Sequence, residues 1–270
     1  MTSSPDATSK PTPGAVAQFI LDHVAGLTFC DIGGIGLNAM NERVSVALDG
    51  GATEATMIDF RREGFPEWDA FRAKMQGAGL SSYKTIAGAN LEHESFPDTV
   101  GSYDFVHSTG ILYHAPAPLR VLDNLARITR RFLITNTIIA PDVMETDAGR
   151  LEFPGSQIVF LPGISEQERS VMELYYQKLL GWPAGRFSAF VPRIGDKQAA
   201  MPWLQTRAAS PAHYWGAHGD LSFSPYWWLF TKDAFRAAVK LFGFEIRQEH
   251  SFKGHTLSVF CEKIPAPPPA

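Results

Sequence analysis

The chain has 270 residues, of which 45% are hydrophobic and 19% are charged, and its formal net charge is −4. This length can bury a sizeable core and excludes a short peptide module. The acidic balance disfavours a nucleic-acid partner, because nucleic-acid-binding proteins usually present a basic face. No apolar run approaches the roughly 18 residues needed to span a bilayer, and the N-terminus has no signal-peptide pattern. We therefore expect a cytoplasmic protein without membrane contact.

The two ends of the chain have a different composition from the rest. Residues 1–13 and 265–270 are rich in Pro, Ser and Ala, and we expect both segments to be disordered. Only two cysteines are present, Cys30 and Cys261, so no disulfide framework is indicated. We expect both thiols to be reduced and buried on different strands.

Between these ends, short apolar runs alternate with helical patterns, which is typical of a mostly parallel α/β sheet. The periodicity predicts the following elements in chain order: helix Ala15–Val24, strand Leu27–Ile32, helix Asn38–Leu48, strand Glu54–Asp59, helix Pro66–Met75, strand Tyr83–Ala87, strand Tyr103–Ser108, helix Pro118–Ile128 and strand Phe132–Ile139.

This alternation stops after residue 139. Residues 140–226 are aromatic, punctuated by Pro and Gly and poorly periodic, with one clear helix predicted at Glu166–Leu180. Because a structureless loop of that length is unusual, we interpret the segment as an inserted, partly helical cap. The predicted organisation is a core of residues 14–139 and 227–264 with a cap of residues 140–226.

The C-terminal part returns to the β/α pattern. A helix is predicted over Thr231–Phe242, followed by strands Phe244–Phe252 and Thr256–Lys263. Only three residues separate these strands, so they should form an antiparallel hairpin. A dehydrogenase sheet would instead continue with parallel strands joined by helices.

The stretch CDIGGIG at residues 30–36 places a glycine-rich turn between a strand and a helix. Such a turn lets a ligand approach the main chain, and the helix start offers free N–H groups. Residues 34–39 also match the dinucleotide fingerprint G-x-G-x-x-G/A, which is a weak signal alone. Asp31 would repel a pyrophosphate and would favour a ligand with a cationic group. A tight turn without a ligand is the alternative interpretation.

FCDIGGIG followed by TMIDF resembles motifs I and II of class I S-adenosylmethionine-dependent methyltransferases. The resemblance extends over residues 27–139 and 226–263, and it implies a Rossmann-like α/β sheet that binds S-adenosylmethionine. GANL at 88–91 resembles the turn after the third strand of this family. VHSTGILYH at 106–114 resembles a branch with G-V/I-L-Y-H, seen in the tRNA wobble-uridine carboxymethyltransferases. PYWWLFTKDAFRAAVKLFGFEI resembles the segment before the closing hairpin.

The resemblance also implies roles for individual residues. Asp31 would lie near the cofactor's ammonium group, and Asp59 would accept hydrogen bonds from both ribose hydroxyls. Taken alone, an Asp at position 59 is more often a helix-capping or solvated residue. The implied cofactor contacts are Asp31, Gly33, Gly34, Gly36, Asp59, Phe60, Asn90, Leu91, Ser108, Thr109 and Gly110. The adjacent glycines of GGIG depart from the usual E/D-x-G-x-G spacing, which leaves open which amide contacts which cofactor atom.

Methyl transfer from a sulfonium needs alignment of the acceptor and exclusion of water. No metal-binding motif is visible, so we expect no metal. A hydroxyl or amine acceptor needs a base, and the candidates are His114, His213 and His218, whereas His107 within a strand should be buried and structural.

We expect the cap to recognise the acceptor, since five of the six Trp residues lie between Trp182 and Trp228. These rings could instead form the core of the cap. The sequence therefore predicts a methyltransferase for a small-molecule acceptor, with O-methylation ahead of N-methylation. The alternatives are a tRNA-modifying methyl or carboxymethyl transferase and a non-catalytic cofactor-binding protein. The oligomeric state is open.

Overall fold

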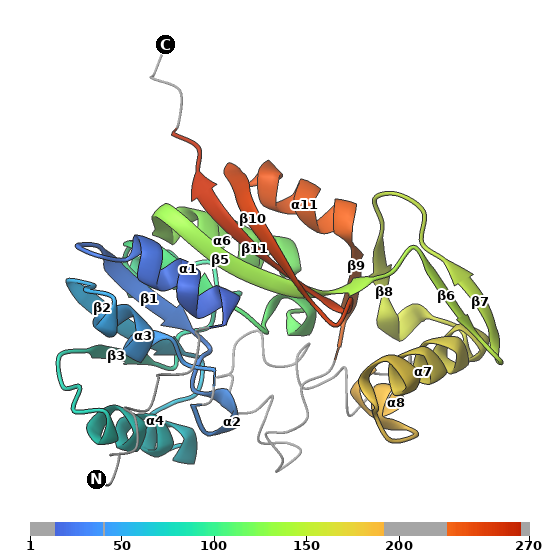
Figure 1. Ribbon diagram of the computed structural model, residues 1–270, viewed down its shortest axis with the longest axis horizontal. Coiled ribbons are helices and arrows are strands. Elements are labelled where there is room, and N and C mark those ends of the chain that lie inside the picture. The colour runs from blue at the N-terminus through green and yellow to red at the C-terminus, as the bar shows by residue number, and fades with distance from the viewer. Residues whose placement is uncertain (1–13, 40, 192–225, 266–270) are drawn as a thin grey trace, which may run out of the picture.

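The computed structural model of the protein describes residues 14–39, 41–191 and 226–265. Its centre is a twisted sheet with the strand order β10-β11-β5-β4-β1-β2-β3, shown in Figure 1. The strands of this order are β1 (Thr28–Ile32), β2 (Glu54–Asp59), β3 (Lys84–Ala87), β4 (Tyr103–Ser108), β5 (Thr129–Ala140), β10 (Phe244–Phe252) and β11 (Thr256–Lys263).

The direction of the strands changes at one place in the sheet. Strands β3, β2, β1, β4 and β5 are all parallel to their neighbours. Strand β11 pairs antiparallel with both β5 and β10, which makes the C-terminal pair a hairpin lying against β5. This confirms the predicted Rossmann-like α/β sheet with a terminal antiparallel hairpin.

Helices cover both faces of the sheet, and each face has its own apolar cluster. On one face, Phe29, Met57 and Phe105 pack against α1 (Ala15–His23), α3 (Val44–Asp49) and α4 (Pro66–Gly77). On the other face, Cys30 and Val106 pack against α5 (Phe96–Val100), α6 (Pro118–Ile128) and α11 (Lys232–Leu241). Alternate residues of each strand point to opposite faces, so the continuous apolar runs of β1 and β4 follow from burial on both sides.

One predicted helix was wrong, and one short helix was not predicted. The single helix expected over Asn38–Leu48 is divided into α2 (Gly36–Ala39) and α3 (Val44–Asp49). Ala39 has a positive φ of 58°, a conformation that ends a right-handed helix. The short helix α5 was not predicted, because its five residues, with Pro97 in the first turn, are too few to show a periodic pattern.

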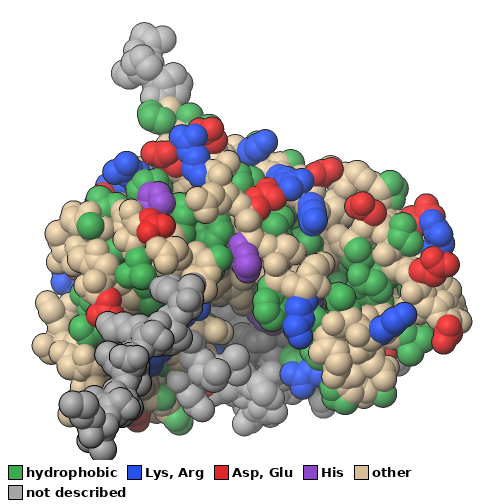
Figure 2. All heavy atoms as spheres, viewed as in Figure 1, with side chains coloured by type: hydrophobic (Ala, Val, Ile, Leu, Met, Phe, Trp, Pro, Cys, Tyr) green, Lys and Arg blue, Asp and Glu red, His purple; other side chains and the backbone are tan. Residues whose placement is uncertain are grey.

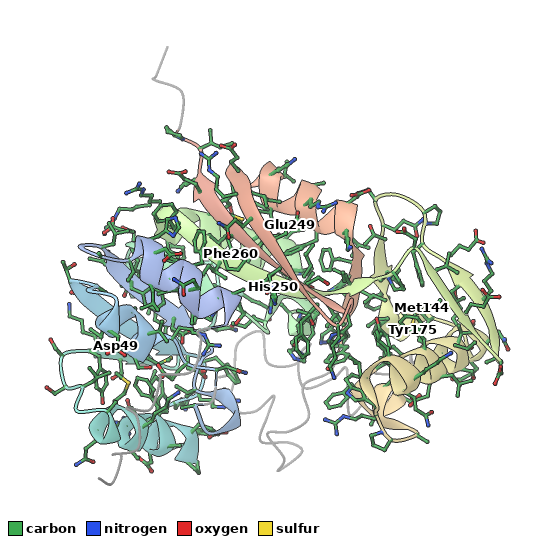
Figure 3. The ribbon with its side chains drawn as sticks, in the orientation of Figure 1. Asp49, Met144, Tyr175, Glu249, His250 and Phe260 are labelled. Carbon is green, nitrogen blue, oxygen red and sulfur yellow. The ribbon has the colours of Figure 1, made fainter. Side chains whose placement is uncertain are left out.

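The segment between β5 and β9 (Trp228–Thr231) forms a separate unit at one end of the central sheet, which we call the cap (Figure 1). It contains β6 (Val143–Thr146), β7 (Gly149–Glu152), β8 (Ile158–Phe160), the 3₁₀ turns at Leu161–Gly163, α7 (Glu166–Leu180) and α8 (Arg186–Phe190). Helix α7 has the predicted bounds, and Ser165 and Glu168 form a capping box at its start. Met144 of β6 and Tyr175 of α7, labelled in Figure 3, belong to the apolar cluster of the cap.

The cap is not purely a helical insertion, because one of its strands joins the central sheet. Strand β8 pairs antiparallel with β9, and β9 pairs parallel with the last two residues of β5. Ile138 and Ala140 of β5 therefore pack in the apolar cluster of the cap, while the first half of the same strand packs in the core. Residues 192–225 of the predicted cap lie outside the described residues, as do residues 1–13 and 266–270.

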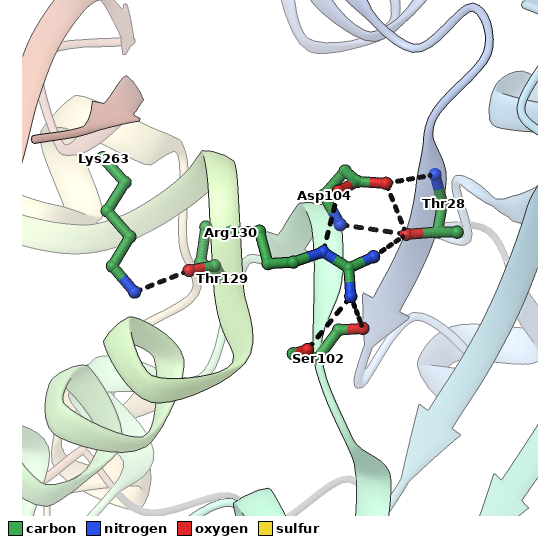
Figure 4. A network of polar contacts seen from close by, with 6 residues as sticks. All are labelled: Thr28, Ser102, Asp104, Thr129, Arg130 and Lys263. Atoms are coloured by element: carbon green, nitrogen blue, oxygen red, sulfur yellow. Dashed lines mark hydrogen bonds and ion pairs between the residues drawn. The ribbon is translucent and has the colours of Figure 1, made fainter. Parts of the chain in front are cut away.

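A polar network closes the N-terminal edge of the parallel strands (Figure 4). The Asp104 carboxylate accepts hydrogen bonds from the main-chain amide and hydroxyl of Thr28, at 3.0 and 2.8 Å, and from Arg130 Nε at 2.8 Å. Arg130 also donates to the carbonyl and hydroxyl oxygens of Ser102. Lys263 donates to the carbonyl of Thr129, where α6 passes into β5. These bonds join β1, β4, β5 and β11 at one edge of the sheet.

Candidate active site

The candidate site lies at the opposite, C-terminal edge of the parallel strands. Strand β1 lies between β2 and β4, so the chain leaves β1 towards β2 and later returns on the other side through β4. Ligands of open α/β sheets bind beyond the strand ends at such a switch point. Glycines with positive φ follow three of these strands, at Gly33, Gly88 and Gly110.

The glycines after β1 have different reasons to be glycine. Gly33 has φ +82°, and a Cβ there would lie 2.8 Å from Cδ1 of Ile111, in the loop after β4. A Cβ on Gly34 would lie only 2.2 Å from the Asp31 carboxylate. At Gly36 the nearest described atom would be Nη2 of Arg61, 4.0 Å away. The fold itself therefore requires Gly33 and Gly34, whereas the described residues leave room for a ligand at Gly36.

Asp31 supports the loop from below. Its side chain has no exposed surface, and it accepts hydrogen bonds from Nδ1 of His107 and from the amide of Arg43, both at 2.7 Å. The other ring nitrogen of His107 lies 3.2 Å from the Thr109 hydroxyl. This buried chain ties β1 to β4 and to the start of α3. His107 is buried as predicted, and both oxygens of Asp31 have partners within the chain.

Asp59 ends β2 and is also enclosed, with 1% of its surface exposed. The amide of Arg61 donates to Asp59 Oδ1 at 2.8 Å, and Arg61 Nη1 lies 3.2 and 3.3 Å from the two carboxylate oxygens. Burial raises the pKa of Asp59 to about 6, although Arg61 acts in the opposite direction and Glu67 adds a smaller rise. The Arg61 guanidinium also lies over the Phe60 ring, 4.8 Å from its centroid. Sequence reasoning missed Arg61, whose only signal was its position two residues after Asp59.

The turn after β3 is fastened to the end of β2. The amide of Ala89 donates to the carbonyl of Asp59 at 3.1 Å. Asn90 is half-buried, and its side-chain oxygen accepts from the amide of Glu92 at 3.0 Å. Leu91 is buried in the core. Of the two predicted residues in this turn, Asn90 therefore keeps a partly exposed amide beside Asp59, whereas Leu91 supports the turn from inside.

Glu92, in the same turn, was not predicted as a site residue. It accepts a hydrogen bond from the amide of Ala117 at 2.8 Å, and burial raises its pKa to about 7. The carboxyl group thus joins the turn after β3 to the start of α6. It is a second acid with a raised pKa at this edge of the sheet, and it is half-buried.

The loop after β4 carries the remaining predicted cofactor residues. Ser108 is buried, and its hydroxyl has no hydrogen-bond partner within the described ranges. The amide of Gly110 donates to the side-chain oxygen of Asn136 on β5 at 2.6 Å. Tyr113 places its hydroxyl 3.9 Å from the position of a Cβ on Gly110. Asn136 and Tyr113 are therefore additions to the predicted set, and both were found through their contacts with Gly110.

Aromatic side chains connect this loop to the cap. His114 is half-buried between Tyr113 and Tyr226, with ring centroids 4.2 and 5.1 Å away. Tyr226 stacks on Phe190 of α8 at 5.1 Å. The amide of Tyr226 donates to the carbonyl of Phe190, and the next amide along the chain donates to the carbonyl of Tyr113. We call Tyr113, His114, Tyr226 and Phe190 the aromatic row. Of the predicted base candidates, only His114 can be placed, because His213 and His218 lie outside the described residues.

In residues 14–39, 41–191 and 226–265, no group of three or more His, Cys, Asp or Glu side chains is arranged to hold a metal ion. Within those ranges, no helix has the length and hydropathy to cross a bilayer. Cys30 and Cys261 are both buried and unbridged, on β1 and β11.

Solved structures with a similar fold are known. A S-adenosylmethionine dependent methyltransferase from Mesorhizobium loti is 16% identical, with a TM-score of 0.50 over 92% of this chain and 96% of that chain. The N-terminal domain of EvdMO1 with SAH bound is 15% identical, with a TM-score of 0.50 over 94% and 82%. The protein has the class I methyltransferase fold. No protein-family model and no curated protein matches the sequence.

Proposed function

We propose that the protein is an S-adenosylmethionine-dependent methyltransferase that acts on a small-molecule acceptor. One observation carries the proposal: at the switch point of a methyltransferase-type sheet, a glycine turn after β1 lies beside a buried acid at the end of β2. Gly36 leaves space above the main chain, and Asp59 is a carboxylate that can accept both hydroxyls of a cis-diol. The residues present therefore fit a sulfonium nucleoside.

In this proposal the cofactor extends along the ends of β1, β2 and β4. Gly33, Gly34 and Gly36 bring the main chain close to its methionine part, and Asp59 binds the ribose. Phe60, Asn90 and Leu91 surround the adenine, while Ser108, Thr109 and Gly110 border the methionine end. Asp31 acts through His107 and the loop that it supports, because its side chain is fully buried and bonded to His107 and Arg43.

S-adenosylmethionine supplies an activated methyl group, so the chain has to align the acceptor, exclude water and remove a proton. The aromatic row begins at the loop after β4, beside Gly110, and provides flat, rigid contact surface for a small organic acceptor. His114 is our candidate base for a hydroxyl acceptor. We assign the Tyr113 hydroxyl, which lies near Gly110, to a contact with the acceptor. Oxygen is the favoured acceptor atom and nitrogen the second.

The division of labour follows from this arrangement. We propose that residues 14–139 and 227–264 bind the cofactor and that residues 140–226 recognise the acceptor. On the face drawn in Figure 2, positive and negative side chains are interspersed, which favours a small acceptor over a polyanion such as tRNA.

Titration calorimetry with S-adenosylhomocysteine, the demethylated product, tests the proposal. The wild-type protein should bind it, and Asp59→Ala should weaken binding by about 1.5–3 kcal/mol, the scale for losing a charged hydrogen-bond partner. Asp49→Ala, which changes an exposed acid at the end of α3 (Figure 3), is the matched control and should bind like the wild type. Equal affinities for the Asp59 variant and the wild type would contradict the site.

A further inference from the structure

The Arg61 side chain lies across the part of the site that the proposed function assigns to a ribose. Its Nη1 contacts both oxygens of Asp59, and its Nη2 is the described atom nearest to a Cβ position on Gly36. Its guanidinium carbon also lies over Phe60. One cationic side chain thus touches three of the positions that a nucleoside would use.

Arg61 and Asp59 shield each other from solvent. The Asp59 side chain is 0% exposed and that of Arg61 is 11% exposed. Hydroxyl groups of a ligand therefore reach the Asp59 carboxylate only after the guanidinium has moved. Arg61 is the side chain that has to leave, because the other bond to Asp59 comes from a main-chain amide at 2.8 Å.

The contacts of the guanidinium are suited to exchange. Its distances of 3.2 and 3.3 Å to Asp59 are long for charge-assisted hydrogen bonds, which are usually about 2.7–2.9 Å. Arg61 Nε also lies 3.4 Å from Glu67, a partner that can retain the cation after it leaves Asp59. The short amide bond meanwhile keeps the Asp59 carboxylate in place.

We propose that Arg61 is a positioning residue that holds the Asp59 carboxylate in the free protein. When the cofactor binds, its two ribose hydroxyls replace the Arg61 guanidinium on Asp59. This inference rests on the proposed function. The carboxylate is thus kept charged and oriented before the ligand arrives. The binding step replaces one set of hydrogen bonds with another and leaves no buried charge without a partner.

Arg61 then has two opposite effects on cofactor affinity. It competes with the ribose, which weakens binding at every pH. It also stabilises the ionised form of Asp59, whose pKa is already raised to about 6 by burial and, to a smaller extent, by Glu67. Without Arg61 this pKa would rise further, so the ionised fraction would fall at a higher pH. The competition dominates well above the pKa, and the loss of charge dominates near it.

Calorimetric titration with S-adenosylhomocysteine between about pH 5.5 and pH 8.5 tests this inference. Arg61→Gln should bind about 2–5-fold more tightly than the wild type at the highest pH, the scale of one weak ion pair. It should bind several-fold more weakly near pH 6, so the two affinity profiles should cross. Arg62→Gln, at an exposed neighbouring position, is the matched control and should follow the wild type.

The outcomes separate this inference from the proposed function. Wild-type binding at high pH tests the proposed function, and a wild type that does not bind contradicts both proposals. Wild-type binding combined with an Arg61→Gln profile lowered by one constant factor would show that Arg61 contacts the ligand or only supports the fold, and would overturn the inference. An unchanged profile would overturn it as well. Carboxyl NMR of the free proteins gives an independent readout, because the pKa of Asp59 should be higher in Arg61→Gln.

Discussion

Asp104 lies at the N-terminal edge of the central sheet and Asp59 at its C-terminal edge, and the two carboxyl groups differ in proton affinity. Hydrogen bonds from Arg130 lower the pKa of Asp104 to about 2, with help from Thr28. Burial raises the pKa of Asp59 to about 6 and that of Glu92 to about 7. The first edge has polar groups that stabilise the folded chain, whereas the second keeps acids in surroundings that disfavour their charge. Acids whose pKa is raised by burial are common where a protein binds a ligand or carries out a reaction.

The largest effect is expected at the glycine turn of the C-terminal edge. Gly34→Ala would place a Cβ 2.2 Å from the Asp31 carboxylate, and should lower the free energy of unfolding by about 3 kcal/mol, the upper range for overpacking. Denaturant unfolding measures this change.

Gly36→Ala is the matched control in the same turn, since no described atom comes closer than 4.0 Å to its Cβ position. It should change the free energy of unfolding by less than about 1 kcal/mol and weaken binding of S-adenosylhomocysteine. Equal unfolding free energies for the two variants would show that the Asp31 contact does not limit the loop.

A smaller effect of opposite sign is expected at Glu92. Because its folded pKa of about 7 exceeds the usual 4.5, the folded protein retains this proton over that interval and loses stability as pH rises through it. Glu92→Gln removes the charge and can still accept the hydrogen bond from Ala117. With about 1.4 kcal/mol for each tenfold change in proton affinity, the full rise from 4.5 to about 7 corresponds to about 3.5 kcal/mol. Because Glu92 is only half-buried, solvent screening should reduce the gain of the variant to roughly 2–3 kcal/mol at about pH 8.

Thermal unfolding followed at two pH values checks the Glu92 prediction. The gain should vanish near pH 4, where the wild-type carboxyl group is protonated in the folded and the unfolded chain. A stabilisation of the same size at both pH values would mean that packing, rather than charge, is the cause.

The smallest effect is expected at the N-terminal edge. Asp104→Asn should lower the free energy of unfolding by about 1–2 kcal/mol at neutral pH, because the network loses the negative charge and one of its two accepting oxygens. The folded pKa of Asp104 is depressed, so its contribution should be lost as pH falls from about 4 towards 2. Affinity for S-adenosylhomocysteine should not change. A large loss of binding would contradict the view that the N-terminal edge only stabilises the fold while the C-terminal edge binds the ligand.

Elements with local signals were predicted well. Strands β2 and β4 and helices α6 and α7 have the bounds expected from apolar runs ended by polar, Gly or Pro residues. Thr231 caps α11 through the amide of Ala234, as a Thr at that position indicated. These signals depend on a few neighbouring residues, and the tertiary structure does not override them.

Contacts between distant segments could not be predicted in this way. Strands β8 and β9 pair although they lie far apart in the sequence. Both are too short to show an alternating pattern, so the sequence does not identify them as partners. The sequence indicated Asp31 and Asp59 as site residues, but it did not indicate their partners. His107 reaches Asp31 only because β1 and β4 are neighbours in the sheet. The hydrogen-bond partners of Asp31 are therefore known only from the three-dimensional structure.

The junction between core and cap has a consequence for how the protein can vary. Ala140 at the end of β5 and Thr231 at the end of β9 are paired across neighbouring parallel strands, which lie about 4.8 Å apart. The chain thus leaves the sheet after β5 and returns through β8 and β9 beside the same strand. The residues between β8 and β9 can therefore change in number without altering the order of the core strands. Under the proposed function, acceptor preference can thus change through the cap while the strands proposed to bind the nucleoside stay the same.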